Sequence, residues 1–380
     1  ARALGLMKGT WFQRYLLPGF IIQSSMIGGA YGSGKELQQF FFGHGPLGGL
    51  LGMCVTMAIF AIVLMAAYEF SRRFQLFDYR CFSKALLGPI WPVYEILFLM
   101  VIILVISVVG AVAGEVLNDS FGLPNFVGVL GIMVFIAIIV FFGTPGVEKV
   151  LAVWSFVLFA TYILFLGWHL VQNGDQIASN FASQPITGGW AQSGLAYSGY
   201  NLSTVPALVF CIYHMSKRRE ALTAGAIAGV LTMLPAMLFY IAMVGQYDVI
   251  MAAGEDGPLP VSILMGALEG AGFFVYLFPI VLFGTFVETG TALIHGVNER
   301  IDHTFAERGV RMPNWMRPAV ALAILFSAVV IADAIGLTGL VARGYGTITW
   351  GFIVVLFIPL LTWGVFLIWR ADRVDAARSP

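Results

Sequence analysis

Long apolar runs, separated by short polar stretches, make up most of this chain. Most of the runs reach about 20 residues or more, the length at which a helix crosses a bilayer. A soluble protein built from helices this uniformly apolar would have no polar face to turn toward water. The pattern therefore predicts an all-α integral membrane protein with ten transmembrane helices, at about residues 11–43, 46–70, 91–117, 124–142, 147–171, 192–214, 220–245, 270–298, 316–335 and 345–369.

Two of these spans are interrupted near their centres by small and polar residues. The first span contains Gly28–Gly34 (GGAYGSG), and the sixth contains Tyr197–Ser203 (YSGYNLS). A helix that breaks inside a bilayer leaves main-chain groups that hydrocarbon cannot satisfy, so the break must face protein, water or a ligand. Paired breaks at corresponding places in two repeats are the best indication, from sequence, of a secondary transporter's binding site.

The interrupted spans divide the chain into two similar halves. The second break lies five spans after the first, an odd number, so the two broken helices cross the membrane in opposite directions. Polar stretches at 71–89 and 246–269 occupy matching places after the second and the seventh span. This spacing predicts one transmembrane domain over residues 1–380, built as a 5+5 inverted repeat with halves at about 11–172 and 187–370.

Composition and charge agree with a membrane location and suggest an orientation. Charged residues are 11% of the chain and hydrophobic residues 59%, whereas soluble domains carry roughly 25% charged residues. Of the 20 Lys and Arg residues, 18 fall on one side if the N-terminus is cytoplasmic, which is the side that positive charge favours. We therefore expect a multi-pass protein of the cell membrane with both termini in the cytoplasm, and no cleavable signal peptide before the first span.

Other functional classes find little support in the sequence. Gly29–Lys35 fits the phosphate-loop pattern G-x-x-x-x-G-K, but Glu36 follows where that loop needs Ser or Thr, and an apolar span replaces the preceding strand. We find no H-E-x-x-H motif or nucleophile–base pair, so we expect no enzyme. The three cysteines are isolated, and no two histidines have metal-ligand spacing, so we expect no metal site.

The glycines of the first break suit a solute site. Glycine leaves helical angles at little cost, and a half-helix beginning near Ser33–Glu36 would point its free N–H groups at a carboxylate. The preceding half-helix ends near Ser24–Ile27, where the hydroxyls of Ser24 and Ser25 could coordinate a cation. The alternative is that these glycines only allow close helix packing. The substrate-binding residues predicted from the two breaks are Gly29, Ala30, Tyr31, Gly32, Ser33, Gly34, Lys35, Ser198, Gly199, Tyr200 and Asn201.

The string Gly32–Phe41 (GSGKELQQFF) resembles the first-helix motif of the YkvI-like membrane proteins, in which we expect Gln at the position of Lys35. That group belongs to the amino acid–polyamine–organocation superfamily, whose fold is usually named after the bacterial leucine transporter. The resemblance implies alternating-access transport of an amino acid or related solute, coupled to Na⁺ or H⁺. It also implies that Ser107 lines the pocket, that Glu36 supports the break by accepting main-chain N–H bonds, and that hydroxyls of span 8 face span 1. The hydroxyls concerned are those of Thr285, Thr289 and Thr291.

Two charged residues within the spans leave alternatives open. Lys35 lies roughly 12 Å inside the outer end of its span, at 1.5 Å per residue. It could reach the surface or pair with Glu36 or Glu115 as a structural or gate residue, attract an anionic substrate group, or replace a coupling ion. Glu288, near the centre of span 8, could bind sodium, carry a proton, or be satisfied by a neighbouring helix without a role in transport.

Taken together, these features predict a secondary active transporter for an amino acid or similar small zwitterion. No acidic residue lies between Tyr15 and Ser33, which favours zwitterions over simple amines. The alternatives are a solute sensor on a transporter scaffold and an uncoupled channel. We expect a small organic solute and the lipid bilayer as partners, no nucleic acid, and no cofactor beyond Na⁺ as a coupling ion.

Overall fold

The computed structural model describes residues 10–26, 30–142, 145–268, 270, 272–307 and 309–378, and these residues form helices and turns without a strand. Within them, six helical stretches are long and apolar enough to cross a membrane: Pro46–Phe74, Tyr79–Phe121, Trp190–Ile212, Arg218–Val244, Tyr276–Ala306 and Met316–Ala377. The prediction of an all-α membrane protein is confirmed. The count of ten spans and the inverted repeat stay predictions.

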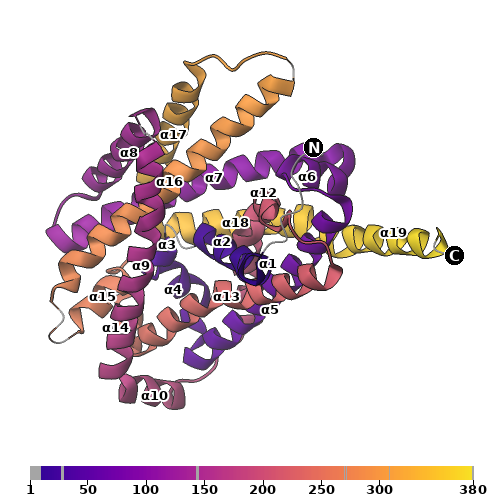
Figure 1. The fold of residues 1–380 in the computed structure, drawn as a ribbon. Coiled ribbons are helices and arrows are strands. Elements are labelled where there is room, and N and C mark those ends of the chain that lie inside the picture. The colour runs from indigo at the N-terminus through magenta and orange to yellow at the C-terminus, as the bar shows by residue number, and fades with distance from the viewer. Residues whose placement is uncertain are drawn as a thin grey trace.

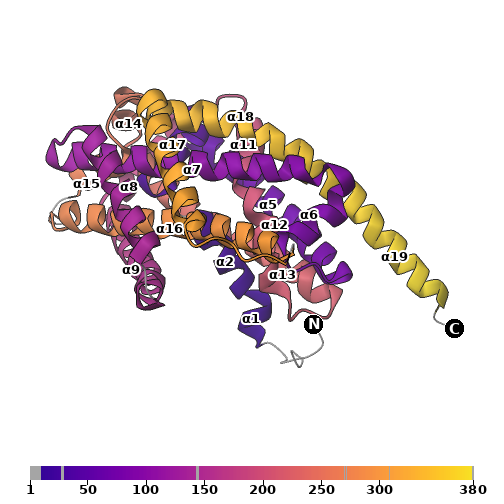
Figure 2. The same ribbon diagram turned by 90° about the horizontal axis from the view of Figure 1, so that it is seen from above.

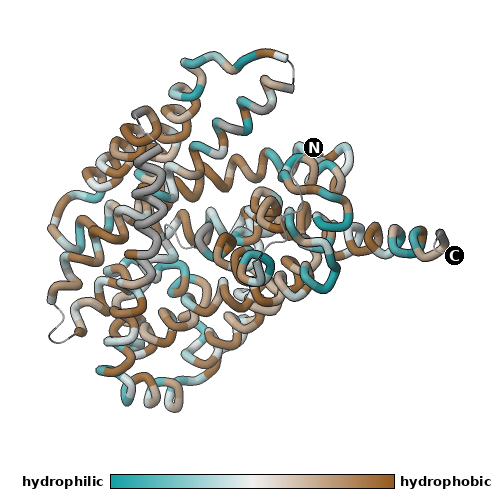
Figure 3. The backbone as a smooth tube through the Cα atoms, viewed as in Figure 1, coloured by the Kyte–Doolittle hydropathy of each residue, from teal (hydrophilic) through white to brown (hydrophobic). Residues whose placement is uncertain are grey.

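The long helices follow the predicted spans closely. In the first half these are α5 (Pro46–Phe74), α7 (Trp91–Phe121), α8 (Asn125–Phe142) and α9 (Pro145–Gln172). In the second half they are α13 (Arg218–Val244), α16 (Phe274–Glu307) and α17 (Met316–Gly339). In the helices other than α9, hydrophobic residues cover most of the length, and hydrophilic residues gather at several of the ends and connections (Figure 3).

The first span is divided into short helices. These are α1 (Trp11–Tyr15), α2 (Leu17–Met26), α3 (Ala30–Ser33) and α4 (Lys35–Phe41). Gly34, between α3 and α4, has a φ of +83°, a left-handed conformation that residues with a Cβ rarely adopt. A Cβ there would also lie 2.9 Å from the Cβ of Pro260. The glycine therefore permits the turn from which α4 begins, inside the Ser33–Glu36 region expected from the sequence.

The sixth span is interrupted later than its sequence suggests. Helix α11 (Trp190–Asn201) runs through most of the predicted break, and regular α-helix ends only at Asn201. It is followed by the 3₁₀ turn η3 (Leu202–Thr204), α12 (Val205–Leu208) and the 3₁₀ turn η4 (Val209–Ile212). Pro206 has no N–H to donate to the carbonyl of Leu202, which explains why the regular helix stops there. Gly199 instead allows close packing, because a Cβ would lie 2.8 Å from the carbonyl oxygen of Thr349.

Shorter helices connect the spans. They are η1 (Phe42–His44), α6 (Tyr79–Leu87), η2 (Gly88–Ile90), α10 (Gly174–Ser183), α14 (Tyr247–Ala253) and α15 (Pro260–Gly266). After a kink at Gly336 (φ +72°), the last part of the chain winds through η5 (Leu340–Tyr345), α18 (Gly346–Phe352), η6 (Ile353–Phe357), η7 (Leu360–Gly364) and α19 (Val365–Arg378). Helix α19, drawn in yellow, projects from the bundle in both views (Figures 1 and 2).

Eight of the helices pack in two groups. Helices α2, α5, α11 and α13 form one group, and α7, α8, α16 and α17 form the other. The most extensive contact in the described structure joins α5 and α13. Small residues allow it, since a Cβ on Gly225 of α13 would lie only 2.5 Å from the main-chain nitrogen of Met65.

Candidate functional site

The break in the first span lies between the two groups of helices. Helix α3 contacts α7, whereas α4 contacts α5 and α11. The main-chain carbonyl of Gly32 accepts a hydrogen bond from the hydroxyl of Tyr162 on α9. A Cβ on Gly32 would lie 2.6 Å from Leu282 of α16, so span 8 also approaches the break. Elements from both halves of the chain therefore surround this segment.

The carboxylate of Glu36 joins the two interrupted spans. It is 3% exposed, and its Oε2 accepts a hydrogen bond of 2.5 Å from the hydroxyl of Tyr200 on α11. The side chain of Tyr197 and the main chain of Tyr31 add hydrogen bonds to it. The ring of Tyr345, from η5, stacks on that of Tyr200, with centroids 4.1 Å apart and planes at 6°. Four tyrosines thus interact with one buried carboxylate.

Aromatic rings extend this contact along α4 and α11. The ring centroid of Phe41 lies 5.1 Å from that of Tyr197, and that of Phe40 lies 5.5 Å from the same ring. Both pairs have the tilted, edge-to-face geometry that aromatic rings prefer. The two interrupted spans are therefore held together by an aromatic contact with a carboxylate at its centre.

Among the residues predicted to bind substrate, Tyr31 is the best placed to receive a ligand. Its ring is 2% exposed, and its hydroxyl is buried without a hydrogen-bond partner. A buried hydroxyl in that state is unfavourable unless a ligand or water satisfies it. By contrast, the Ser198 hydroxyl donates to the Gly194 carbonyl at 2.8 Å, and the Asn201 amide donates to the Tyr197 carbonyl at 2.9 Å. Those two side chains use hydrogen bonds within α11.

Lys35 contacts a different region from Glu36. Its side chain is buried, and its ammonium group donates to the main-chain carbonyl of Glu255, in the loop between α14 and α15. Thr338 donates to the same carbonyl at 3.0 Å, and Gln38 donates to the neighbouring Gly254 carbonyl at 3.1 Å. The carboxylates that interact with Lys35 are those of Glu115, Asp119, Glu255 and Asp256. Of the alternatives for Lys35, this arrangement favours the structural or gate role.

The predicted ion site is described only in part. In α16, the Thr285 hydroxyl donates to the Val281 carbonyl at 3.0 Å, and that of Thr291 is buried without a partner. Glu288 and Thr289 are half-buried on the same helix. In α7, Ser107 is fully buried and donates to the Ile103 carbonyl at 2.8 Å. Gly29 and the side chains of Ser24, Ser25 and Ala30 lie outside the described residues.

Three tyrosines at this site were not predicted from the sequence. Tyr162 donates to the main-chain carbonyl of Gly32, while Tyr197 and Tyr345 flank Glu36. Their residue type alone could have marked them in the sequence as candidates, because a tyrosine hydroxyl inside an apolar span needs a polar partner. The partner itself comes from a distant part of the chain, so the sequence cannot name it.

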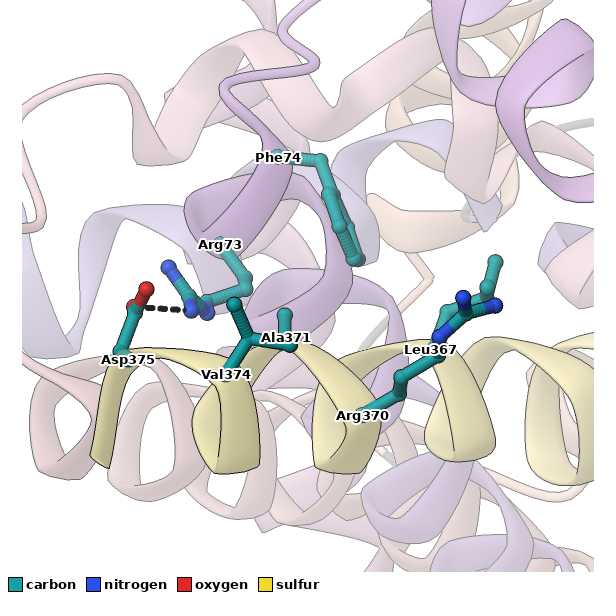
Figure 4. Close-up of a pocket in the computed structure, with 7 residues that line it drawn as sticks. All are labelled: Arg73, Phe74, Leu367, Arg370, Ala371, Val374 and Asp375. Atoms are coloured by element: carbon teal, nitrogen blue, oxygen red, sulfur yellow. Dashed lines mark hydrogen bonds and ion pairs between the residues drawn. The ribbon is translucent and has the colours of Figure 1, made fainter. Parts of the chain in front are cut away.

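A groove of about 340 Å³ lies elsewhere, between the end of α5 and the projecting helix α19. Figure 4 shows Arg73 directed toward Asp375, with which it forms an ion pair. The apolar side chains of Phe74 and Leu367 also line the groove. It shares no lining residue with the breaks in the first and sixth spans.

Solved membrane-protein structures share this arrangement along nearly its full length. MhsT in complex with L-phenylalanine has 14% identity over 96% of this chain and 98% of its own, with a TM-score of 0.54. A manganese transporter from Eremococcus coleocola has 15% identity over 93% of this chain and 83% of its own, with a TM-score of 0.55. The chain has the leucine-transporter fold.

A sodium-coupled sialic acid symporter shows the same fold, with 11% identity over 89% of this chain and 80% of its own, and a TM-score of 0.52. No protein-family model and no curated protein sequence matches the chain. Identities this low establish the fold alone. Membership of the YkvI-like group therefore stays a prediction from the first-helix motif.

Proposed function

We propose that this protein is a secondary transporter that moves an amino acid or a similar small zwitterion by alternating access. The observation that carries the proposal is the contact between the two interrupted spans, in which Tyr200 of α11 donates to the buried carboxylate of Glu36 on α4. Within this fold, such a contact links the two segments that border the central site. The resolved complex of MhsT with L-phenylalanine supports an amino acid as the class of solute.

In this proposal the solute lies beside the break at Ala30–Gly34. Its carboxylate would accept hydrogen bonds from main-chain N–H groups of the break. The unpartnered hydroxyl of Tyr31 would supply a further hydrogen bond. Lys35 would not touch the solute, because its ammonium group is already bound to the loop carbonyl of Glu255.

Coupling to Na⁺ or H⁺ forms part of the same proposal. The sialic acid symporter with this fold is described as sodium-coupled. The oxygen atoms proposed for a sodium site are those of Ser24, Ser25, Thr285, Thr289 and Glu288. The buried, unpartnered hydroxyl of Thr291 on the same helix adds one more candidate ligand.

A divalent metal as cargo finds less support. One structure with this fold is a manganese transporter. Among the residues that the structure describes, however, no three His, Cys, Asp or Glu side chains are grouped to hold a metal ion. We also propose a single domain with inverted halves at about 11–172 and 187–370, placed in the cell membrane with both termini cytoplasmic.

The test is the thermal stability of the purified protein with a panel of amino acids and small amines, in sodium and in choline buffers. A ligand that binds only the folded state adds about 2.7 kcal/mol at a hundred times its dissociation constant. Stabilisation only in sodium would support a sodium symporter, and stabilisation in both buffers would support protons or exchange. No stabilisation by any amino acid would contradict the proposed solute class.

A matched pair of variants locates the binding site. Tyr31→Phe removes the hydroxyl proposed to contact the solute, so it should weaken ligand-induced stabilisation. Tyr276→Phe removes a hydroxyl from a side chain that is 67% exposed on α16, and it should leave the stabilisation unchanged. Equal behaviour of the two variants would remove Tyr31 from the site.

A further inference from the structure

Among the residues that the structure describes, those around Glu36 provide hydrogen-bond donors but no compensating positive charge. Helix α11 contributes the hydroxyls of Tyr197 and Tyr200, and α3 contributes the main chain of Tyr31. Tyr345 of η5 also interacts with the carboxylate. All of these groups are neutral. A carboxylate buried inside a membrane span without a counter-ion is unfavourable, and such residues mark functional sites.

In the described structure, the basic residues of α4 and η5 form no ion pair with Glu36. The ammonium group of Lys35 donates to the Glu255 carbonyl, and the carboxylates with which it interacts do not include Glu36. Arg343 of η5 is exposed.

Two further elements, η1 and α5, pack against α4. In η1, His44 bonds with the Ser193 hydroxyl at 2.8 Å. In α5, Glu69 pairs with Arg72 at 2.8 Å. Arg73 pairs with acidic residues of α19, Tyr68 interacts with Cys211, and Cys54 is exposed.

The packing around Glu36 restricts which cation can bind. Glu36 is 3% exposed, and Tyr197, Tyr200 and Tyr345, which surround its carboxylate, are each 5% exposed or less. A sodium ion or a solute ammonium group would need room for several ligands at once, whereas a proton occupies no additional volume. The enclosed cluster therefore favours a proton.

We propose that Glu36 is a proton-binding site that couples proton movement to the contact between the two interrupted spans. The carboxylate takes a proton from water when the site opens to one side and becomes a neutral carboxyl, then returns the proton to water on the other side. Hydrogen bonds to a charged acceptor are roughly twice as strong as those between neutral groups. Protonation therefore weakens the bond from Tyr200, and with it the contact between α4 and α11. This inference rests on the proposed transport function and names its coupling ion.

The first test needs no transported solute. Infrared difference spectra of the purified protein between alkaline and mildly acid pH should contain, beside the bands of other titrating carboxyls, the carbonyl stretch of one buried protonated carboxyl. Glu36→Gln should remove that component, and Glu288→Gln should keep it. A band that survives in Glu36→Gln, or disappears only in Glu288→Gln, would overturn the inference.

A second variant covers the case in which Glu36→Gln does not fold. Tyr200→Phe keeps the carboxyl but removes a hydrogen bond that favours the charged form. The midpoint at which the band appears should rise by about one pH unit, a tenfold gain in proton affinity. An unchanged midpoint in a folded Tyr200→Phe protein would contradict the assignment.

Transport in proteoliposomes separates this inference from the proposed function. Solute exchange between labelled and unlabelled pools needs no ion gradient, so it measures transport without coupling. Relative to its own exchange rate, Glu36→Gln should lose at least tenfold in uptake driven by an inward proton gradient. Gradient-driven uptake that persists in Glu36→Gln would overturn the inference and leave the transport function standing. Absence of solute exchange in the wild-type protein would instead refute the transport function.

Discussion

An ion pair joins α1 to α13 on the face of the protein that the charge distribution predicts to be cytoplasmic. The Arg14 guanidinium lies 2.7 Å from Glu220, whose side chain is only 5% exposed. The second carboxylate oxygen of Glu220 accepts a hydrogen bond of 3.0 Å from the main-chain N–H of Ser216. If the protein works by alternating access, opening toward this face must break the Arg14–Glu220 bond. We therefore expect Arg14→Gln to favour the state open on this side.

The size of the effect follows from the burial of the pair. A hydrogen bond to a charged group contributes about 1.5–3 kcal/mol. The Arg14 side chain is 23% exposed, so solvent screening reduces its share. We expect a net change of about 1–2 kcal/mol, equivalent to a roughly 5–30-fold rise in the ratio of open to closed states.

Cys211 provides a reporter within the native chain. It is 4% exposed and lies in η4, which packs against α2, so movement of the first span should uncover it. Cys54 and Cys81 are exposed and would be replaced by serine. The rate at which an added maleimide labels Cys211 should rise in Arg14→Gln by the factor given above.

The matched control is Arg317→Gln. Arg317 pairs with Asp302 at 3.0 Å, but both side chains are more than 40% exposed, so labelling should stay at the wild-type rate. The reasoning fails if Arg14→Gln folds normally and labels Cys211 no faster than the wild type. It also fails if both variants accelerate labelling equally.

Three further predictions concern the first break. Gly34→Ala places a Cβ at φ +83°, which should cost roughly 1–2 kcal/mol and lower Tm; Gly43→Ala, with open space at its Cβ, should not. Lys35→Gln should speed amide hydrogen exchange in the loop at residues 254–256 several-fold. Exchange as slow as in the wild-type protein would contradict the role of Lys35 in holding that loop. Tyr162→Phe removes the bond to the Gly32 carbonyl and should cost about 1 kcal/mol; an unchanged Tm would show that this bond contributes little.

The membrane spans could be predicted because hydropathy is a local property. The seventh span was expected at about 220–245, and α13 covers Arg218–Val244. The turn at Gly34 could also be predicted, because several glycines close together inside an apolar run favour a break in the helix. Both features depend on residues that lie close together in sequence.

Local sequence patterns were a poorer guide to where the sixth span is interrupted and to the partners of Glu36. Gly199 suggested a break, but it serves close packing against Thr349, and the helix stops later because Pro206 lacks an N–H. The partner of Glu36 is Tyr200, 164 positions away. Only the folded chain brings them together, and for that reason the sequence led us to expect main-chain N–H groups or Lys35 as partners of Glu36 and did not point to Tyr200.

The close contact between α5 and α13 has a consequence for measuring motion. Because the main chains meet at Gly225 with no room for a methyl group, neither helix can slide past the other without separating first. The pair should therefore move as one rigid unit in the proposed transport cycle. Spin labels on the outer faces of these two helices should therefore keep a constant distance. That distance is an internal reference against which displacements of α7, α8, α16 and α17 can be measured.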